Sequence, residues 1–453
     1  MRSRAAGFAF AIALTVGGCS LLFNGNDLKG RNGDMGGGGT GGGDSDMGGA
    51  GGAGGGGTGG GGGTTSMCTP LTSVKFTVTH PSVAASTPRY LTVSDINKDG
   101  KLDLVTSNYD SNSFSVLLGD GSGGFALAAS TPIGTCANPD EVVARDVNGD
   151  GLDDLIITCW TGSAAAVNVH VNQSTTSTVA FAAAKPVTLP ASGHYFFPAP
   201  GTFDASGHVG LALVGNGGAT FYAGDGAGNF TKGSTVNAGA GAQSAAVGKL
   251  NGDALDDLIV YNSDDTDMTM MLSGSSPYTA TRIAYDATGA TTGGTPGGTT
   301  YFGSTPILLD YDGDGLLDIV IASGTSVPGE IYFFKNGGTA SAPMFGIQPT
   351  TMVAVGDIPS TLALADLNCD GKLDIASSSN GCTQNTQGCT NSMDQPPQLW
   401  VLDGHGTGFD PRQTTAIDAY CDTLAVADFN GDGYNDIACG SDGGTFNLLI
   451  NTP

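Results

Sequence analysis

The stretch DINKDGKLDL, Asp95 to Leu104, places side-chain oxygens at alternate positions and then continues into a strand-like run. Asp95, Asn97 and Asp99 occupy positions 1, 3 and 5, and Asp103 occupies position 9. Together with a backbone carbonyl at position 7, this spacing wraps a loop around a hard cation, and an all-protein oxygen cage suits calcium better than magnesium. The glycine at position 6 provides the positive φ that the sharp turn needs.

The motif recurs along the chain. Intact copies begin at Asp146 (DVNGDGLDDL), Asp310 (DYDGDGLLDI), Asp366 (DLNCDGKLDI) and Asp428 (DFNGDGYNDI), and KLNGDALDDL at Lys249 is a damaged copy. We expect about five calcium ions, because crowded carboxylates repel one another without a cation. With the position-7 carbonyl included, the expected ligands are Asp95, Asn97, Asp99, Lys101 and Asp103; Asp146, Asn148, Asp150, Leu152 and Asp154; Asp310, Asp312, Asp314, Leu316 and Asp318; Asp366, Asn368, Asp370, Lys372 and Asp374; and Asp428, Asn430, Asp432, Tyr434 and Asp436.

These loops differ from EF-hands, which end on a bidentate Glu at position 12 and lead into a helix. Position 12 is never acidic here, and the segments that follow, such as LVTSN and IVIAS, are short and β-branched. Apolar residues stand at position 10 and two residues before position 1 in every copy. Each loop is therefore predicted to be the tip of a β-hairpin with one buried face.

The spacing of the loops predicts the architecture. A decayed copy, TFDASGHVGLALV at Thr202 to Val214, fills the double gap between Asp146 and Lys249, so the loops number one to seven along the chain. Six steps from Asp95 to Asp428 give about 55 residues per repeat, the size of a four-stranded blade. A third strand recurs in each repeat, and the last repeat lacks a fourth. We predict an all-β, seven-bladed β-propeller in which Val74 to His80 completes blade seven and closes the ring.

The loop D-x-[DN]-x-D-G-x-x-D, followed by LLGDGSGGF or AGDGAGNF, resembles the FG-GAP or VCBS repeats of integrin α-subunit propellers and their bacterial relatives. The resemblance covers residues 74 to 453. It implies a seven-bladed propeller with calcium in its hairpin loops. It does not specify a function, because this fold carries adhesins, lectins, lyase domains and scaffolds.

The first residues resemble an export signal. Residues 1–19 contain Arg2 and Arg4, a short apolar run and VGGC, which resembles a bacterial lipobox and implies lipidation of Cys19. The alternative is an ordinary signal peptide with an incidental cysteine. Ser20 resembles the signal of outer-membrane lipoproteins, so we expect an extracytoplasmic protein facing the periplasm or the cell surface. Residues 20–67 are a Gly-rich flexible linker, and residues 68–453 form the propeller.

Charge limits the partners. Removing Arg2 and Arg4 with the leader leaves 14 basic against 42 acidic residues, a net charge of −28, and five calcium ions would bring it to −18. Such a surface is unsuited to nucleic acid and to anionic lipid, so membrane contact is expected through the lipid anchor alone. We expect a monomer.

Eight cysteines besides Cys19 fit an oxidising compartment. We expect four disulfides. Blade topology places three pairs on the face opposite the calcium loops: Cys136 with Cys159, Cys421 with Cys439, and Cys382 with Cys389. Cys68 and Cys369 remain and are paired by elimination.

Candidate ligand residues lie on the opposite face, where unequal insertions fall. His194 and Tyr195 suit a sugar ring or a peptide, although the adjacent Phe196 and Phe197 could instead plug neighbouring blades. Trp160 could stack on a ligand or cap a disulfide, and Trp400 is expected in the core. At position 1 of loop four, Lys249 could place its ammonium in the cation site or simply be exposed.

An enzyme is the least supported function. The five histidines fall in different repeats, and no G-x-S-x-G motif occurs. The sequence favours a non-catalytic, calcium-binding lipoprotein that acts as a binding or adhesion module for an extracellular protein or glycan. A carbohydrate-binding lectin is the alternative, and the propeller of a polysaccharide-degrading enzyme comes third.

Overall fold

A computed structural model describes residues 68–453 with short gaps, together with the backbone of Cys19–Ser20. The gaps are 83–87, 133–135, 161–164, 190–196, 216, 266, 275–277, 284–304, 323–329, 347–348, 355–358, 360, 379–383, 386–387, 390–396, 406–407, 411–412, 419–420 and 442–445. The described residues contain no helix, and so none that could span a membrane.

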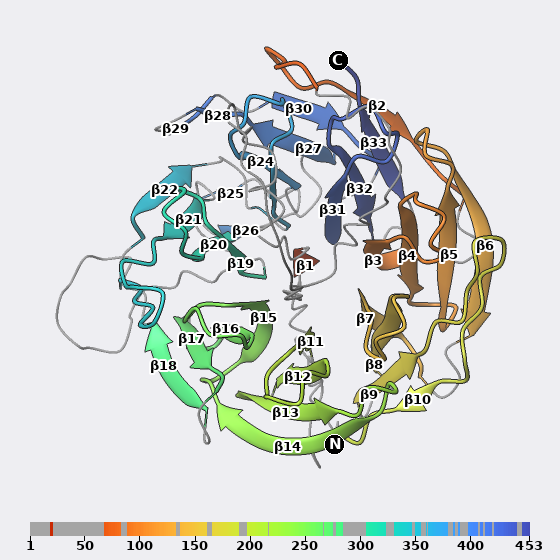
Figure 1. Ribbon diagram of the computed structural model, residues 1–453. Helices are drawn as coiled ribbons and strands as arrows, with labels where there is room; N and C mark the ends of the chain where they lie inside the picture. The colour runs from red at the N-terminus through yellow and green to blue at the C-terminus, as the bar shows by residue number, and fades with distance from the viewer. Residues whose placement is uncertain are drawn as a thin grey trace, which may run out of the picture.

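Seven antiparallel sheets stand around a central axis as the blades of a propeller (Figure 1). Blades one to three comprise β3 (Pro88–Ser94), β4 (Asp103–Asn108), β5 (Ser113–Gly119) and β6 (Phe125–Pro132); β7 (Pro139–Arg145), β8 (Asp154–Trp160), β9 (Ala165–His170) and β10 (Lys185–Pro186); and β11 (Phe197–Gly201), β12 (Gly210–Gly215), β13 (Gly218–Gly224) and β14 (Phe230–Asn237). Blades four to six comprise β15 (Ala242–Gly248), β16 (Asp257–Asn262), β17 (Asp267–Leu272) and β18 (Thr279–Ile283); β19 (Ile307–Leu309), β20 (Asp318–Ala322), β21 (Glu330–Phe334) and β22 (Thr351–Ala354); and β23 (Ala363–Ala365), β24 (Asp374–Ser378), β27 (Gln398–Leu402) and β30 (Gln413–Ala416). The predicted blade number is confirmed.

Blade seven is completed from the other end of the domain. Its strands β31 (Thr423–Ala427), β32 (Asp436–Gly440) and β33 (Asn447–Asn451) are followed by β2 (Phe76–Thr79), which pairs antiparallel with β33. The backbone of β1 (Cys19–Ser20) pairs with the inner edge of β31. The prediction that the Val74–His80 segment closes the ring is confirmed.

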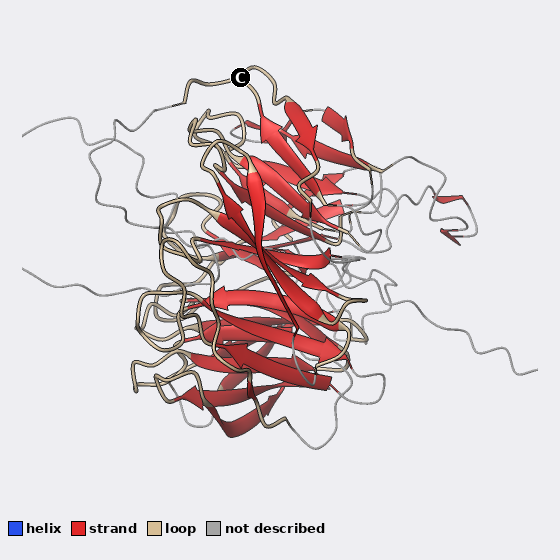
Figure 2. Ribbon diagram, turned by 90° about the vertical axis from the view of Figure 1, so that its right-hand side faces the viewer, coloured by secondary structure: helices blue, strands red, loops and turns tan. Residues whose placement is uncertain are grey.

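Small hairpins decorate blade six. Its insertion contains β25 (Gln384–Asn385) and β26 (Gly388–Cys389), and its outer loop contains β28 (Gly404–His405) and β29 (Gly408–Phe409). Figure 2 shows the ring from its side, with loops projecting from both faces.

The apolar residues that bracket each loop are buried, as predicted. The position-10 residues of all seven loops are 0% exposed; they are Leu104, Leu155, Leu211, Leu258, Ile319, Ile375 and Ile437. They pack in clusters within blades and between neighbouring blades. The same packing occurs between blades one and seven, where the ring closes. Leu91 and Leu117 of blade one meet Ala438 and Leu448 of blade seven in one buried cluster. Burial of this kind, at about 25 cal/mol per Å² of apolar surface, is the main force holding blades together.

Candidate calcium loops and ligand face

The five intact loops share one hydrogen-bonding pattern. In each, the position-6 N–H donates to Oδ2 of the position-1 Asp, the position-5 N–H to Oδ1 of position 3, and the position-7 N–H to Oδ1 of position 5. All fifteen distances lie between 2.8 and 3.2 Å. The side chains at positions 1, 3 and 5 are thus folded over their own loop, with lone pairs remaining on each oxygen.

Two positions of every intact loop have left-handed backbone. The position-6 glycines have φ between 83° and 94°, as the motif predicts. Position 4 is also left-handed, which the sequence analysis did not anticipate. It is glycine in loops two, five and seven, but Lys98 (φ 56°) in loop one and Cys369 (φ 63°) in loop six.

Loop five carries the densest group of carboxylates. Asp310, Asp312 and Asp314 each offer an oxygen within 4.8 Å of the others. Lys335, just after β21, forms ion pairs with Asp312 and with Asp314, the latter at 3.1 Å. Carboxylate and amide oxygens brought together at one loop tip fit the donor preference of calcium. Lys335 shows that the fold already places one cation beside this group.

Six of the seven loops have an aspartate at position 9, and each of these aspartates is buried at the base of its loop. In loop one, Asp103 is 0% exposed; its Oδ2 accepts the N–H of Ile96 (2.9 Å) and its Oδ1 that of Gly119 (3.0 Å). The same two-sided bonding recurs at the other five position-9 aspartates, which are Asp154, Asp257, Asp318, Asp374 and Asp436. This residue therefore joins the loop to the end of the third strand, in addition to its predicted role as a ligand.

Burial sets the charge state of these carboxyls. It raises the pKa of Asp103, Asp154, Asp257 and Asp318 to about 6, and that of Asp374 and Asp436 to about 7. The backbone donors act in the opposite direction without overcoming desolvation. A bound cation would favour the ionised form.

Loops three and four have diverged in different ways. Loop four keeps the buried Asp257, but Ala254 at position 6 is not left-handed and Lys249 replaces the first ligand. Of the two alternatives for Lys249, the structure shows a partly exposed side chain with no carboxylate of the described residues within 4.0 Å of its ammonium. Its charge acts on the buried Asp256 at longer range. Loop three has Gly210 at position 9, where a Cβ would lie 2.7 Å from the Tyr222 carbonyl oxygen.

Polar residues at position 8 link neighbouring blades, which the sequence analysis missed. Asp153 of blade two accepts a hydrogen bond from the Ser94 hydroxyl of blade one (2.6 Å). The Asn435 amide of blade seven donates to the Asp366 carbonyl of blade six (2.8 Å). The sequence feature that could have indicated these interblade bonds is a charged or amide residue at position 8, which is leucine in loops one, five and six.

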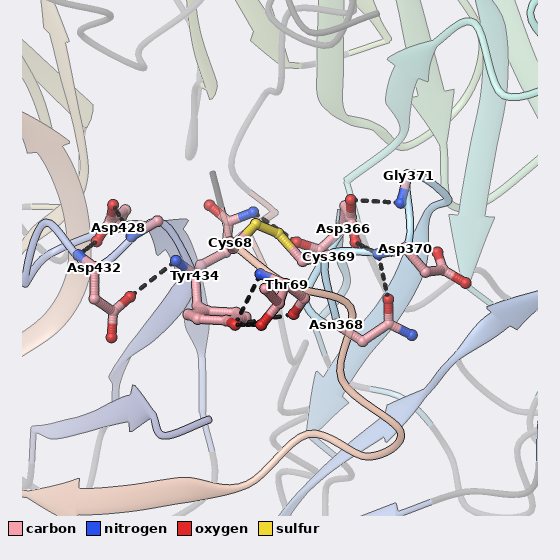
Figure 3. Close-up of a disulfide and its surroundings, with 12 residues drawn as sticks. Cys68, Thr69, Asp366, Asn368, Cys369, Asp370, Gly371, Asp428, Asp432 and Tyr434 are labelled. Carbon is pink, nitrogen blue, oxygen red and sulfur yellow. Dashed lines mark hydrogen bonds between the residues drawn. A yellow bond between two sulfur atoms is a disulfide. The ribbon is translucent and has the colours of Figure 1, made fainter. Parts of the chain in front are cut away.

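Three of the four predicted disulfides lie within the described residues and all three are present. They are Cys68–Cys369, Cys136–Cys159 and Cys421–Cys439. Cys382 lies outside the described residues, so the pairing of Cys382 with Cys389 stays a prediction. Figure 3 shows Cys68–Cys369 between loops six and seven, where elimination had placed it.

The opposite face is described only in part. His194, Tyr195 and Phe196 lie outside the described residues, whereas Phe197 is buried in β11 and Trp400 is 1% exposed in β27, as expected for core. Trp160 is partly exposed, and its backbone N–H donates to the Asn138 carbonyl (3.0 Å). Asn138 in turn donates to the side-chain oxygen of Asn112 in blade one (2.7 Å).

A cationic and aromatic cluster adjoins these residues at the same end of blades one and two. The Arg89 guanidinium lies over the Tyr109 ring (5.3 Å to its centroid) and pairs with Asp140 (3.2 Å). Arg89 is the second residue of β3, Tyr109 follows β4 and Asp140 lies at the start of β7, so all three belong to the face opposite the calcium loops. No local sequence motif marks these three residues, because they are dispersed along the chain.

Comparison with known proteins agrees with the repeat structure. A model of the FG-GAP-like repeat matches residues 95–157 and 310–377, and a model of the FG-GAP repeat matches residues 422–448. No curated protein matches the chain.

Solved structures share the fold at low identity. A lectin of Agrocybe aegerita, described as recognising non-reducing terminal N-acetylglucosamine, aligns with a TM-score of 0.52 and 16% identity over 82% of this chain and 86% of the lectin chain. BBS1N, solved in complex with ARL6DN, aligns with a TM-score of 0.51 and 10% identity over 82% of this chain and 94% of its own. With the seven described blades and the matched repeats together, the chain is a seven-bladed FG-GAP-repeat β-propeller.

Proposed function

We propose that this protein is a calcium-stabilised, non-catalytic binding module that works outside the cytoplasm. The observation that carries the proposal is the identical folding of oxygen donors over the five intact loops. Disulfides and FG-GAP repeats are consistent with an extracytoplasmic protein. Attachment to the outer membrane through a lipid on Cys19 is part of the proposal, and the net charge argues against nucleic acid as the partner.

Calcium in these loops would be structural. All protein ligands of one ion come from one hairpin tip, so the ion adds to stability without needing a second partner. An ion that binds only the folded state contributes about 2.7 kcal/mol when its concentration is a hundred times its Kd. Five such ions would make folding strongly dependent on calcium.

The calcium proposal is tested by counting bound metal and by calorimetry. We expect five calcium ions per chain after dialysis, and a large fall in melting temperature when a chelator is added. Asp314→Asn in loop five should lower the count or the affinity by one site, whereas the matched Asp253→Asn in loop four should change neither. A wild-type protein that binds no calcium and melts at the same temperature in chelator would refute the proposal.

The ligand is proposed to bind the face opposite the calcium loops. In the described part of this face, blades one and two carry Trp160, Tyr109, Arg89 and Asp140. Such a combination of aromatic and charged side chains suits sugar rings or peptide side chains. The two fold neighbours leave both classes open, since one recognises a sugar and the other was solved with a protein.

A glycan-array screen made with calcium and repeated in chelator separates these classes. For a lectin, Trp160→Ala or Tyr109→Ala should abolish a calcium-dependent signal, while Met352→Ala, on the exposed outer strand of blade five, should leave it unchanged. A blank array from folded protein removes the lectin alternative for the sugars sampled and favours a protein ligand.

Catalysis is not part of the proposal. The described histidines, His80, His170, His208 and His405, belong to four different blades. His170 is buried, and burial lowers its pKa to about 4, so it stays neutral at physiological pH. The one group of three clustered acids found among the described residues, Asp310, Asp312 and Asp314, belongs to loop five.

A further inference from the structure

The segment that precedes the closing strand is fastened to two calcium loops at once. Residues 68–71, which we call the clasp, lie between loop six and loop seven (Figure 3). On one side, Cys68 is disulfide-bonded to Cys369, and the Leu71 N–H donates to the Asn368 carbonyl at 2.7 Å. Asn368 and Cys369 are positions 3 and 4 of loop six.

On the other side, the clasp holds loop seven through Tyr434. The Thr69 N–H donates to the Tyr434 hydroxyl at 3.0 Å, and that hydroxyl donates to the Thr69 carbonyl at 2.9 Å. Tyr434 is position 7, whose carbonyl is an expected ligand. The clasp therefore contacts a residue at or next to an expected ligand in both loops.

Cys369 is an unusual residue for its place. Its φ is 63°, a left-handed conformation that glycine adopts at the same position in loops two, five and seven. A side chain with a Cβ is disfavoured there by about 1 kcal/mol or more. The disulfide to Cys68 supplies a reason for a cysteine at this position, because it fixes loop six in the folded conformation of the other intact loops.

The two loops are also bonded directly to each other. Asn435 of loop seven donates to the carbonyl of Asp366, the first residue of loop six, at 2.8 Å. The clasp then leads into β2, which pairs with β33 and closes the ring. Loops six and seven, the clasp and the closing strand are one connected unit.

We propose that the clasp and the calcium ions of loops six and seven stabilise each other, so that these two ions lock the seam of the propeller. The inference rests on the proposed calcium binding. Coupling of this kind is reciprocal: a clasp that raises calcium affinity in the two loops is itself held more firmly when calcium is bound. Within the described residues, loops one, two and five have no such contact with the clasp and serve as internal controls.

The test compares calcium titrations of the whole protein with and without the clasp. In Cys68→Ser/Cys369→Gly, glycine keeps the left-handed turn of loop six while the disulfide is lost. Thr69→Val/Tyr434→Phe weakens the other half of the clasp with all disulfides intact, so a conclusion does not depend on one variant folding well. The matched control, Cys136→Ala/Cys159→Ala, removes a disulfide from the opposite face.

We expect five sites in the wild type, of which two become about tenfold weaker in either clasp variant, within the range typical of such couplings. The control should keep all five. When loops six and seven are first silenced by Asp370→Asn and Asp432→Asn, removal of the clasp should leave the remaining isotherm unchanged. Amide exchange in Phe76–Thr79 should also accelerate on calcium removal.

Two results overturn the inference while leaving calcium binding in place. They are five unchanged sites in the clasp variants, or a uniform weakening shared by the opposite-face control. A wild type that binds no calcium instead overturns the proposed function, and the inference falls with it.

Discussion

The buried aspartate at position 9 can be tested apart from calcium in loop four. Asp257 is 0% exposed, and its carboxylate accepts the N–H groups of Leu250 (2.9 Å), Asn251 (3.2 Å) and Ser273 (2.8 Å). Because Lys249 replaces the first ligand, no ion is expected in this loop. Asp257→Ala therefore measures the structural role alone.

The expected cost follows from the three donors. Each buried N–H left without an acceptor costs about 1 to 3 kcal/mol, so the three together cost roughly 3 to 9 kcal/mol. Against this, burial raises the pKa of Asp257 from 3.8 to about 6, so removing the charge recovers about 3 kcal/mol at pH 8. We expect a net loss of about 3 kcal/mol at pH 8, seen as a fall of roughly 4 °C in melting temperature for a domain of this size.

The sign of the pH dependence is also determined. Since the folded pKa of Asp257 lies above the unfolded one, its protonation stabilises the wild type fully below about pH 4, and this stability is lost as pH rises through about 6. The cost of Asp257→Ala should therefore be larger at pH 5 than at pH 8. Calorimetry with and without calcium should give the same loss. A cost no greater than that of Asp253→Ala, at the exposed position 5 of the same loop, would refute the reasoning.

Three further outcomes are expected. Metal-free protein should lose stability as pH rises from about 4 to 7, because burial raises the pKa of all six position-9 aspartates, and calcium should restore the part that comes from the five intact loops; a flat calorimetric profile would contradict this. Lys335→Met should raise the calcium affinity of loop five several-fold by removing an ion pair that competes for Asp312 and Asp314, whereas the exposed Lys232→Met should not, as titration would show. Deletion of residues 68–82 should expose the β33 edge and cause self-association in light scattering; a well-behaved monomer would argue against closure by β2.

Much of the fold could be predicted because the repeat marks its own boundaries. The loop motif places the first and second strands of each blade, and the double gap between loops two and four places blade three. The segment at Val74 was identifiable as the missing strand because blade seven ends with β33. The outermost strands were harder to predict. β14 and β18 are mostly exposed, so they carry little apolar alternation, and β10 is only two residues long.

The expected calcium ligands could be predicted from the sequence, but the contacts that hold the loops in place were harder to predict. Oxygen spacing within one loop is local and can be read directly from sequence. The clasp joins Thr69 to Tyr434, and the interblade bond joins Asn435 to Asp366, contacts that depend on ring closure. Nor does the motif reveal that position 9 binds backbone on both sides, since an aspartate there already fits a ligand role.

Loops three and four show why these two roles of position 9 separate. Loop four has lost its first ligand but keeps Asp257, as expected if the buried carboxylate holds the hairpin with or without a cation. Loop three has lost the carboxylate itself, and Gly210 passes too close to the Tyr222 carbonyl for any Cβ. Its support comes from the next blade: Asp256 accepts the Thr202 N–H at 2.7 Å, and its own N–H donates to the Thr202 carbonyl at 2.8 Å. A blade can thus lose its cation site when a neighbouring carboxylate holds the loop, which is possible in a closed ring because every blade has a neighbour on both sides.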